Sequence, residues 1–188
     1  MNALRAARPE DAQAIADIYR PYVLNDTVSF ETEAPTAQAM RARMAKSEGL
    51  YPWIVATTGA DDGDIPIAYA YATQFRDRAA YRYVVETSIY VSGAIQGQGI
   101  GRTLYRALLE TLARQGFVQA ISVISTPNVY SIAMHEASGF SNQGMLREIG
   151  FKRGRWLNVQ FWARDLNDAT IPPAEPKPFS EIGLVLPR

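Results

Sequence analysis

Three features of this sequence could do chemistry: a glycine-rich run, a glutamate within an apolar stretch and a lone histidine. The run at 96–101 (QGQGIG) joins the most strand-like segment, 82–91, to the clearest helical segment, 99–116. Glycines at such a junction let a ligand approach the backbone, and the first N–H groups of the helix are unpaired. Those donors and the positive helix end would suit a pyrophosphate. A tight strand-to-helix turn needs glycine equally, so the run alone leaves both interpretations open.

Three kinds of glycine loop compete for this run. A dinucleotide-binding fingerprint needs a third glycine where Arg102 stands and an acidic residue closing a second strand, and neither is present. A P-loop needs Gly-Lys-Ser/Thr, and no lysine lies near. The remaining match is Gln-x-x-Gly-x-Gly, the pattern of a loop that holds the pyrophosphate of coenzyme A.

Glu86 lies in the middle of the strand-like segment 82–91. Alternation along a strand places Glu86 with Ser88 and Tyr90 on one face, and Thr87 with Ile89 on the other. A desolvated carboxyl there would have a raised pKa and could accept a proton from an ammonium group. A solvated charge on an open sheet face is the commoner case for a glutamate.

Composition excludes several other chemistries. The sequence has no cysteine, which excludes disulfides, cysteine-ligated zinc, iron–sulfur clusters and a thiol nucleophile. It has one histidine, His135, so a multi-histidine metal site is excluded and no metal is expected. Nineteen basic residues balance nineteen acidic ones, so neither nucleic acid nor a membrane surface is an expected partner. With no signal-peptide pattern at the N-terminus, we expect a cytoplasmic protein.

Two arginines, Arg76 and Arg78, stand two apart before the strand-like segment 82–91. In an extended chain they would lie on one side, where guanidinium groups suit the paired oxygens of a carboxylate or phosphinate. Two exposed surface arginines are the commoner alternative.

The elements that must position these residues follow from periodicity. Strands are expected at 3–7, 53–57, 65–73, 82–91 and 118–125, with two more between 140 and 164. Helices are expected from 8–11 onward, from Thr36 to Gly49, at 99–116 and at 128–138. This order predicts an α/β (α+β) domain over 1–167 with a mixed central sheet of about seven strands. Five prolines after Asp168 predict an extended or disordered tail over 168–188.

Five segments then point to one family. They are 28–33 (VSFETE), 80–91 (AYRYVVETSIYV), 96–112, 128–140 (NVYSIAMHEASGF) and the WLNVQFWARDL stretch from Trp156. In this order and spacing, the chain over 3–166 resembles the GNAT superfamily of N-acetyltransferases, and within it the phosphinothricin and methionine sulfoximine acetyltransferase group. The resemblance implies the GNAT fold, with helices on both faces of the sheet, and acetyl-CoA as co-substrate.

The same resemblance implies roles for individual residues. Glu86 matches the position of the group's general base. His135 stands where most of the superfamily has a tyrosine that protonates the departing thiolate, so it would act as an acid or within a base network with Glu86. Asn128 and Ser131 would bind the pantetheine arm, although Asn128 could instead cap its helix. The further residues expected to bind the coenzyme, partly through backbone groups that polarise the thioester carbonyl, are Ile89, Tyr90, Val91, Gln96, Gly97, Gln98, Gly99, Ile100, Gly101, Arg102 and Thr103.

Acceptor recognition is assigned in the same way. Phe30 and Glu31 resemble the group's substrate loop, Arg76 and Arg78 would hold an acidic group, and Tyr81 and Thr87 are weaker candidates. Lys152, Arg155, Trp156 and Asn158 would line the site or a dimer seam, while strand spacing makes Trp156 and Trp162 better candidates for core or interface.

The resemblance therefore implies an N-acetyltransferase that acts on the α-amino group of phosphinothricin, methionine sulfoximine or methionine sulfone. The amine would attack the thioester directly in a ternary complex, and the enzyme would form a homodimer. The alternatives are transfer to another amine, such as a peptide N-terminus, polyamine or aminoglycoside, and a CoA-binding sensor without catalysis. The sequence leaves the physiological amine open.

Overall fold

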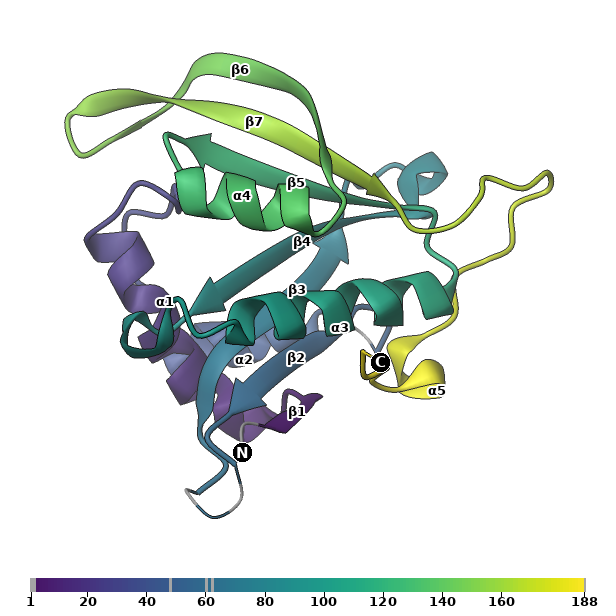
Figure 1. Cartoon of the computed structure of the whole chain (residues 1–188), viewed down its shortest axis with the longest axis horizontal. Coiled ribbons are helices and arrows are strands. Elements are labelled where there is room, and N and C mark those ends of the chain that lie inside the picture. The colour runs from purple at the N-terminus through teal and green to yellow at the C-terminus, as the bar shows by residue number, and fades with distance from the viewer. Residues whose placement is uncertain (1–2, 48, 60, 62, 188) are drawn as a thin grey trace.

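The computed structural model describes residues 3–47, 49–59, 61 and 63–187. Seven strands form one sheet in the order β1-β2-β3-β4-β5-β7-β6 (Figure 1). Among the described strands, β4 and β5 pair in parallel and all other neighbours are antiparallel. The strands are β1 (Ala3–Ala6), β2 (Trp53–Thr57), β3 (Pro66–Gln74), β4 (Val84–Val91), β5 (Gln119–Thr126), β6 (Ser141–Lys152) and β7 (Arg155–Asp165). The mixed sheet with helices on both faces confirms the predicted GNAT fold.

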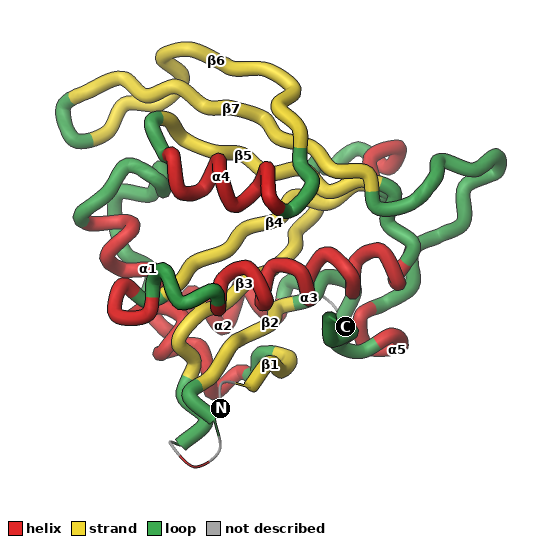
Figure 2. The backbone as a smooth tube through the Cα atoms, in the orientation of Figure 1, coloured by secondary structure: helices red, strands yellow, loops and turns green. Residues whose placement is uncertain are grey.

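Helices cover the sheet on both faces, and Figure 2 distinguishes these helices, in red, from the strands, in yellow. Figure 1 shows α3 and α4 in front of the sheet, with α1 and α2 behind it. The helices are α1 (Ala12–Leu24), α2 (Ala37–Ala45), α3 (Ile100–Gln115), α4 (Val129–Ala137) and the short α5 (Phe179–Ile182). The second helix was expected to run to Gly49 but ends at Ala45, four residues earlier.

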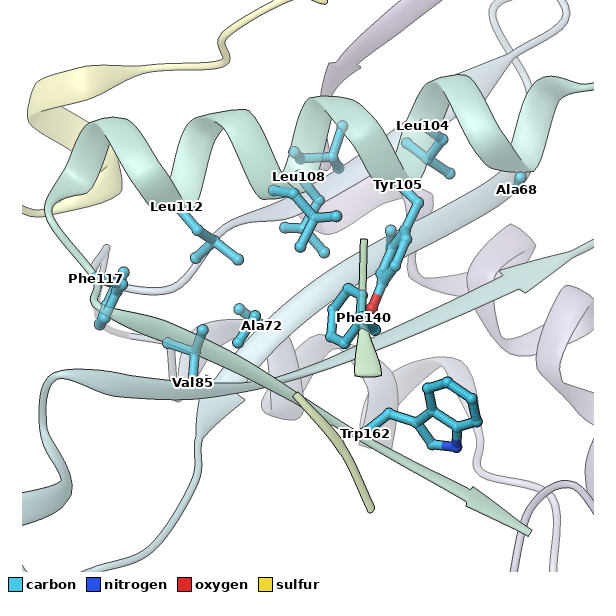
Figure 3. Packing of buried hydrophobic residues seen from close by; sticks show 14 of the residues in the cluster. Ala68, Ala72, Val85, Leu104, Tyr105, Leu108, Leu112, Phe117, Phe140 and Trp162 are labelled. Atoms are coloured by element: carbon cyan, nitrogen blue, oxygen red, sulfur yellow. The ribbon is translucent and has the colours of Figure 1, made fainter. Parts of the chain in front are cut away.

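The main core lies between α3 and the sheet. Leucines of α3 at helical spacing, such as Leu104, Leu108 and Leu112, point from the helix toward the sheet around Ala72 and Val85 (Figure 3). Gly116, in the left-handed region at φ 94°, ends the helix.

A second core lies on the opposite face. There α1 and α2 pack Ile15, Tyr19 and Met40 against Trp53 and Tyr69 of the sheet. Two faces with separate apolar clusters explain why β2 and β3 are mostly apolar on both sides.

The C-terminal segment is described over 168–187 and packs against the rest of the domain. Most of it is irregular, but it contains α5, and the Lys177 N–H donates to the Gln115 carbonyl at 2.7 Å. Glu175 pairs with Arg82 at 2.6 Å. A backbone bond therefore holds this segment at the end of α3 and an ion pair holds it to the residue two before β4, because these regions supply partners that local sequence does not reveal.

Within the described residues, no helix is long and apolar enough to span a membrane.

Candidate active site

A cleft of about 820 Å³ opens where β4 and β5 separate. The two strands pair only where 84–86 lie opposite 119–121, and beyond that point they diverge, as Figure 1 shows. The walls of the cleft come from the later halves of both strands, the glycine loop before α3, and α4. The fork therefore exposes strand backbone that a continuous sheet would pair.

Ser122 stands at the point where the strands part. Its hydroxyl lies 3.0 Å from the Thr87 carbonyl, in the direction where β5 would otherwise offer a backbone N–H, and can donate to it. A side chain thus offers a partner to the first carbonyl of β4 beyond the part paired with β5.

The peptide groups of Ile89 face into the fork. The Ser92 N–H donates to the Ile67 carbonyl of β3 at 2.9 Å, so by alternation the peptide groups of Thr87, Ile89 and Val91 point toward β5. The Val91 carbonyl accepts from the Tyr22 hydroxyl at 2.6 Å. In the part of the chain that the structure describes, Ile89 has no strand opposite it on this side, which makes its N–H available to a ligand carbonyl.

The glycine loop forms one end of the cleft. Gly97 and Gly99 both have φ +80°, which strongly favours glycine, and a Cβ built on either meets nothing within 4 Å. Gly99 is the N-cap of α3, so the first N–H groups of that helix face the open space. Gly101 lies close to β4, where a Cβ would come within 3.1 Å of Val91 Cγ2. Open space, free N–H donors and the positive helix end together fit a pyrophosphate.

Most, but not all, of the predicted coenzyme-binding residues line the cleft. Gln98 and Thr103 do not line the cleft, and the Thr103 hydroxyl instead bonds back to the Gly99 carbonyl at 3.4 Å. Asn128 caps α4, because its Oδ1 accepts from the Ser131 N–H at 3.1 Å. The predicted residues that do line the cleft are Ile89, Tyr90, Val91, Gln96, Gly97, Gly99, Ile100, Gly101, Arg102, Asn128 and Ser131.

Glu86 is half-buried at the last position of β4 that pairs with β5, on the face toward α1 and α2. Burial raises the pKa of its carboxyl, and the positive charge of Arg76 partly offsets that rise. A carboxyl with a raised pKa beside the fork can take a proton from an amine bound there.

His135 lies on the other side of the sheet from Glu86. Its Nε2 is 2.8 Å from Ser122 Oγ and its Nδ1 is 2.7 Å from the Ser131 carbonyl. Burial lowers the pKa of the imidazole, and the Ser131 carbonyl opposes this. The alternative of a base network that joins His135 to Glu86 therefore has no support in this geometry.

Thr87 is misplaced as an acceptor-binding residue. Its side chain is 2% exposed and points to the α3 face, where Oγ1 is 2.8 Å from the Tyr105 hydroxyl and donates to the Ile121 carbonyl. Because neighbouring residues of a strand face opposite sides, Thr87 cannot share the Glu86 face.

The other acceptor candidates come from the loop before α2 and from the segment between β3 and β4. Glu31 forms two bonds of 2.8 Å with Arg43, a residue that the sequence did not single out, and this guanidinium lowers the pKa of Glu31. Arg76 lies over the ring of Phe75 at 4.9 Å, and Tyr81 meets the same ring edge-on at 5.8 Å.

Phe30 is 41% exposed and packs against Gly150 of β6. Arg78 is exposed at the start of the 3-10 turn Ala79–Tyr81. Of the two arginines, it is the charge of Arg76 that lowers the pKa of Glu86.

The tip of the β6–β7 hairpin holds the loop after α1. The buried Lys152 amine donates to the Ser29 carbonyl at 2.6 Å, and Arg155 donates to the Thr27 hydroxyl at 3.3 Å. Trp156 is 60% exposed, whereas Trp162 is buried in the main core. The side-chain oxygen of Asn158 accepts from the Glu148 N–H within the hairpin.

Tyr22 and Ser122 are residues that sequence reasoning missed. Tyr22 lies at helical spacing with Ile15 and Ile18, as a core residue would, and Ser122 lies within a mostly apolar strand. A polar residue inside an otherwise buried strand was the available signal for Ser122. The described residues contain no cluster of three His, Cys, Asp or Glu side chains that could hold a metal ion.

Comparisons with known proteins show which family this chain resembles over its length. The sequence model of the family described as "Acetyltransferase (GNAT) domain" matches residues 4–160. The chain is 37% identical over 179 residues to a phosphinothricin N-acetyltransferase of Streptomyces viridochromogenes, and the alignment covers 95% of each protein. It is 30% identical to an L-methionine sulfoximine/L-methionine sulfone acetyltransferase of Salmonella typhimurium, over 91% of this chain and 98% of that protein.

A solved structure shares the fold. A GNAT superfamily phosphinothricin acetyltransferase from Sinorhizobium meliloti, crystallised in complex with acetyl-CoA, has a TM-score of 0.85 and 39% identity. The match covers 94% of this chain and 93% of that one.

Proposed function

The chain belongs to the GNAT acetyltransferase family, and from that premise we propose that it transfers the acetyl group of acetyl-CoA to the α-amino group of a small amino-acid-like substrate. Phosphinothricin, methionine sulfoximine and methionine sulfone are the proposed acceptors, since similar proteins carry those names. Acetyl-CoA would bind with its pyrophosphate at the glycine loop and its thioester in the fork between β4 and β5.

The observation that carries this proposal is the pairing of opposite charges beside the fork. Glu86 has a pKa raised by burial, and the positive charge of Arg76 acts on it. A free α-amino acid carries an ammonium and a carboxylate a few bonds apart. Glu86 would receive the ammonium and Arg76 the carboxylate, with Phe30 and Glu31 on the loop before α2 completing the acceptor site.

The chain's residues then divide the work of a direct transfer. Glu86 takes a proton from the ammonium group, which frees the nitrogen lone pair to attack the thioester carbon and form the C–N bond. As the C–S bond breaks, the nitrogen loses its second proton to solvent water and the amide forms. The Ile89 N–H donates to the carbonyl oxygen, where negative charge develops. His135 supplies a proton on the thiolate side. A sequence without cysteine has no thiol to form an acyl-enzyme, which favours a ternary complex.

The test is a CoA-release assay with a panel of amines at fixed acetyl-CoA. The panel holds the three proposed acceptors, a polyamine, an aminoglycoside and a peptide with a free N-terminus. We expect turnover with the amino-acid-like acceptors and a fall of 10²-fold or more in kcat for Glu86→Gln. Glu136→Gln, at an exposed position of α4, is the matched control.

Two results would redirect the proposal. Turnover confined to the polyamine or aminoglycoside would favour transfer to another amine. It would also contradict the role given to Arg76, whose positive charge should repel such polycations. Tight acetyl-CoA binding without CoA release from any panel member would favour a sensor. A cytoplasmic location and a role in detoxification stay predictions.

We further propose that two copies associate through the β6–β7 hairpin. Large apolar side chains are exposed there, including Ile149 at 51%, Phe151 at 61% and Trp156 at 60%. Such a patch is unusual on a monomer. Light scattering should give twice the chain mass of 20.8 kDa, and Trp156→Glu should reduce it to that of one chain. A single-chain mass for the unaltered protein would refute the dimer.

A further inference from the structure

A buried polar network surrounds His135 between α3, α4 and the two strands of the fork. Thr87, Tyr105, Ser122 and His135 are each no more than 3% exposed. Tyr105 Oη lies 2.8 Å from Thr87 Oγ1 and 3.3 Å from Ser122 Oγ. Because unpaired polar groups are costly at this depth, the position of each proton can be worked out by assigning donors to acceptors.

The first assignment concerns the ring of His135. Its Nδ1 is 2.7 Å from the Ser131 carbonyl, which can only accept, so Nδ1 carries a hydrogen. The Ser131 hydroxyl lies 3.3 Å from the same nitrogen. In the neutral ring Nε2 then has a lone pair, and at 2.8 Å the Ser122 hydroxyl must donate to it.

The second assignment concerns Ser122, which has one hydrogen and two acceptors within 3.0 Å, while Tyr105 Oη lies farther away at 3.3 Å. Nε2 of His135 lies at 2.8 Å and the Thr87 carbonyl at 3.0 Å. When the imidazole is neutral, the hydrogen goes to Nε2. When the imidazole is charged, Nε2–H donates to Ser122 Oγ, and the Ser122 hydrogen turns to the Thr87 carbonyl. The charged ring therefore satisfies one more acceptor than the neutral ring does.

Among the charged and titratable groups around His135 described below, none replaces Ser122 as the hydrogen-bond partner of Nε2. Tyr105 is the nearest of them, with its ring 5.1 Å from that of His135, and burial raises its pKa to about 12, so it stays protonated. The positive charge of Arg164 on β7 slightly opposes the rise in the pKa of Tyr105, and its guanidinium donates to the Ser138 carbonyl after α4. Glu136 is exposed on α4, and Glu86 faces the other side of the sheet.

We propose that Ser122 is a positioning residue that stabilises the imidazolium form of His135. Its hydroxyl accepts from the charged ring and donates to the Thr87 carbonyl, where the fork opens. The effect on turnover rests on the function proposed above, but the hydrogen bond is a property of the free protein. Burial alone disfavours the charged ring, and Ser122 supplies the acceptor that makes this form accessible within the core.

The chain offers an unusually direct test because His135 is its single histidine. Labelling with ¹⁵N-histidine gives one pair of ring nitrogen signals, which report the tautomer, the hydrogen bond at Nε2 and the pKa. In the unaltered protein we expect the Nδ1–H tautomer. Ser122→Ala should lower the pKa of His135 and move the Nε2 signal of the neutral ring. Ser122→Thr, which keeps the hydroxyl, should restore both.

Ser125→Ala is the matched control. Ser125 is a buried serine on the same strand that also lines the cleft, but its hydroxyl donates to the Thr27 carbonyl at 2.8 Å. This variant should leave both nitrogen signals and the pKa of His135 unchanged. An unchanged Nε2 signal and pKa in Ser122→Ala would overturn the proposal, as would an Nε2–H tautomer in the unaltered protein. Circular dichroism of each variant shows whether it has folded.

Turnover separates this inference from the proposed function. Each unit by which the pKa falls reduces the imidazolium population at neutral pH about tenfold, and kcat should fall by the same factor while the KM for acetyl-CoA stays constant. If the pKa moves but kcat does not, Ser122 still acts on His135, and the acid role of His135 is refuted. If the pKa stays and kcat falls, the positioning role is refuted.

Discussion

Replacing Gly150 with alanine would displace the aromatic wall of the proposed acceptor site. A Cβ at this position of β6 would lie 2.2 Å from Cε2 of Phe30 and 2.7 Å from two further ring atoms. Ordinary contact begins at 3.4 Å, so the ring has to move by about 1 Å or more. Phe30 is 41% exposed and can swing outward, so the free energy of unfolding should fall by only about 1 kcal/mol.

The consequence for activity follows from the size of that movement. A displacement of about 1 Å in a group that positions a substrate can cost up to about 10²-fold in rate. For Gly150→Ala we expect kcat/KM for the amino acid to fall by roughly 10- to 100-fold, mainly through KM. The Kd for acetyl-CoA should not change, because Gly150 does not line the cleft of the fork.

Steady-state CoA release at varied amino acid, together with calorimetric titration of acetyl-CoA, measures both quantities. Gly93→Ala is the control, since a Cβ there meets nothing within 4 Å and its φ is not in the left-handed region. Phe30→Ala provides the decisive background. With the ring removed, Gly150→Ala should have no further effect. An equal loss in both backgrounds, or a weaker Kd for acetyl-CoA, would refute the reasoning.

Three further predictions test the charges, the glycine loop and the stability of the fold. Arg76→Ala removes the positive charge that lowers the pKa of Glu86, so the acid limb of the kcat/KM profile should move to higher pH; a limb at the same pH would contradict the pairing. Gly99→Ala places a side chain at φ +80°, which costs about 1–2 kcal/mol, and should weaken acetyl-CoA binding about tenfold by calorimetry while the amino acid KM stays constant. Asp11→Asn breaks a carboxylate–guanidinium pair with Arg5 at 2.7 Å, in which the Asp11 side chain is 7% exposed, and should lower the free energy of unfolding in urea by about 2–3 kcal/mol. Although burial raises the pKa of Asp11, its bonds to Arg5 and to the Arg8 N–H lower it overall, so this stabilisation is present at neutral pH and is lost as pH falls through the lowered pKa; a variant as stable as the unaltered protein at pH 7 would exclude it.

Local sequence predicted the elements that carry the site. The leucine spacing of α3, the glycines before and after it and the alternation of β4 depend on neighbours within a few residues, so periodicity reveals them. The same alternation already placed Thr87 on the face opposite Glu86, and the structure confirms that separation. The choice of Thr87 for the acceptor site was inconsistent with it.

Partners distant in sequence were not predictable in this way. Ser122 bonds to a carbonyl 35 residues away, and Tyr22 to one 69 residues away. The prolines of the tail indicated a lack of regular structure, but not that Lys177 would bond to Gln115 at the end of α3. Hydrogen bonds of this kind exist only after the sheet has formed.

The sequence by itself therefore determined the glycine loop, the helix that begins there and the face of β4 that presents Glu86, because backbone conformation depends on short-range sterics and periodicity. Only the tertiary structure decided that β4 and β5 part at Ser122, that the Ile89 N–H faces the gap, and that His135 and Glu86 lie on opposite sides of the sheet. Those features depend on which side chains meet when α3, α4 and the strands pack together, and no spacing along the chain encodes that meeting.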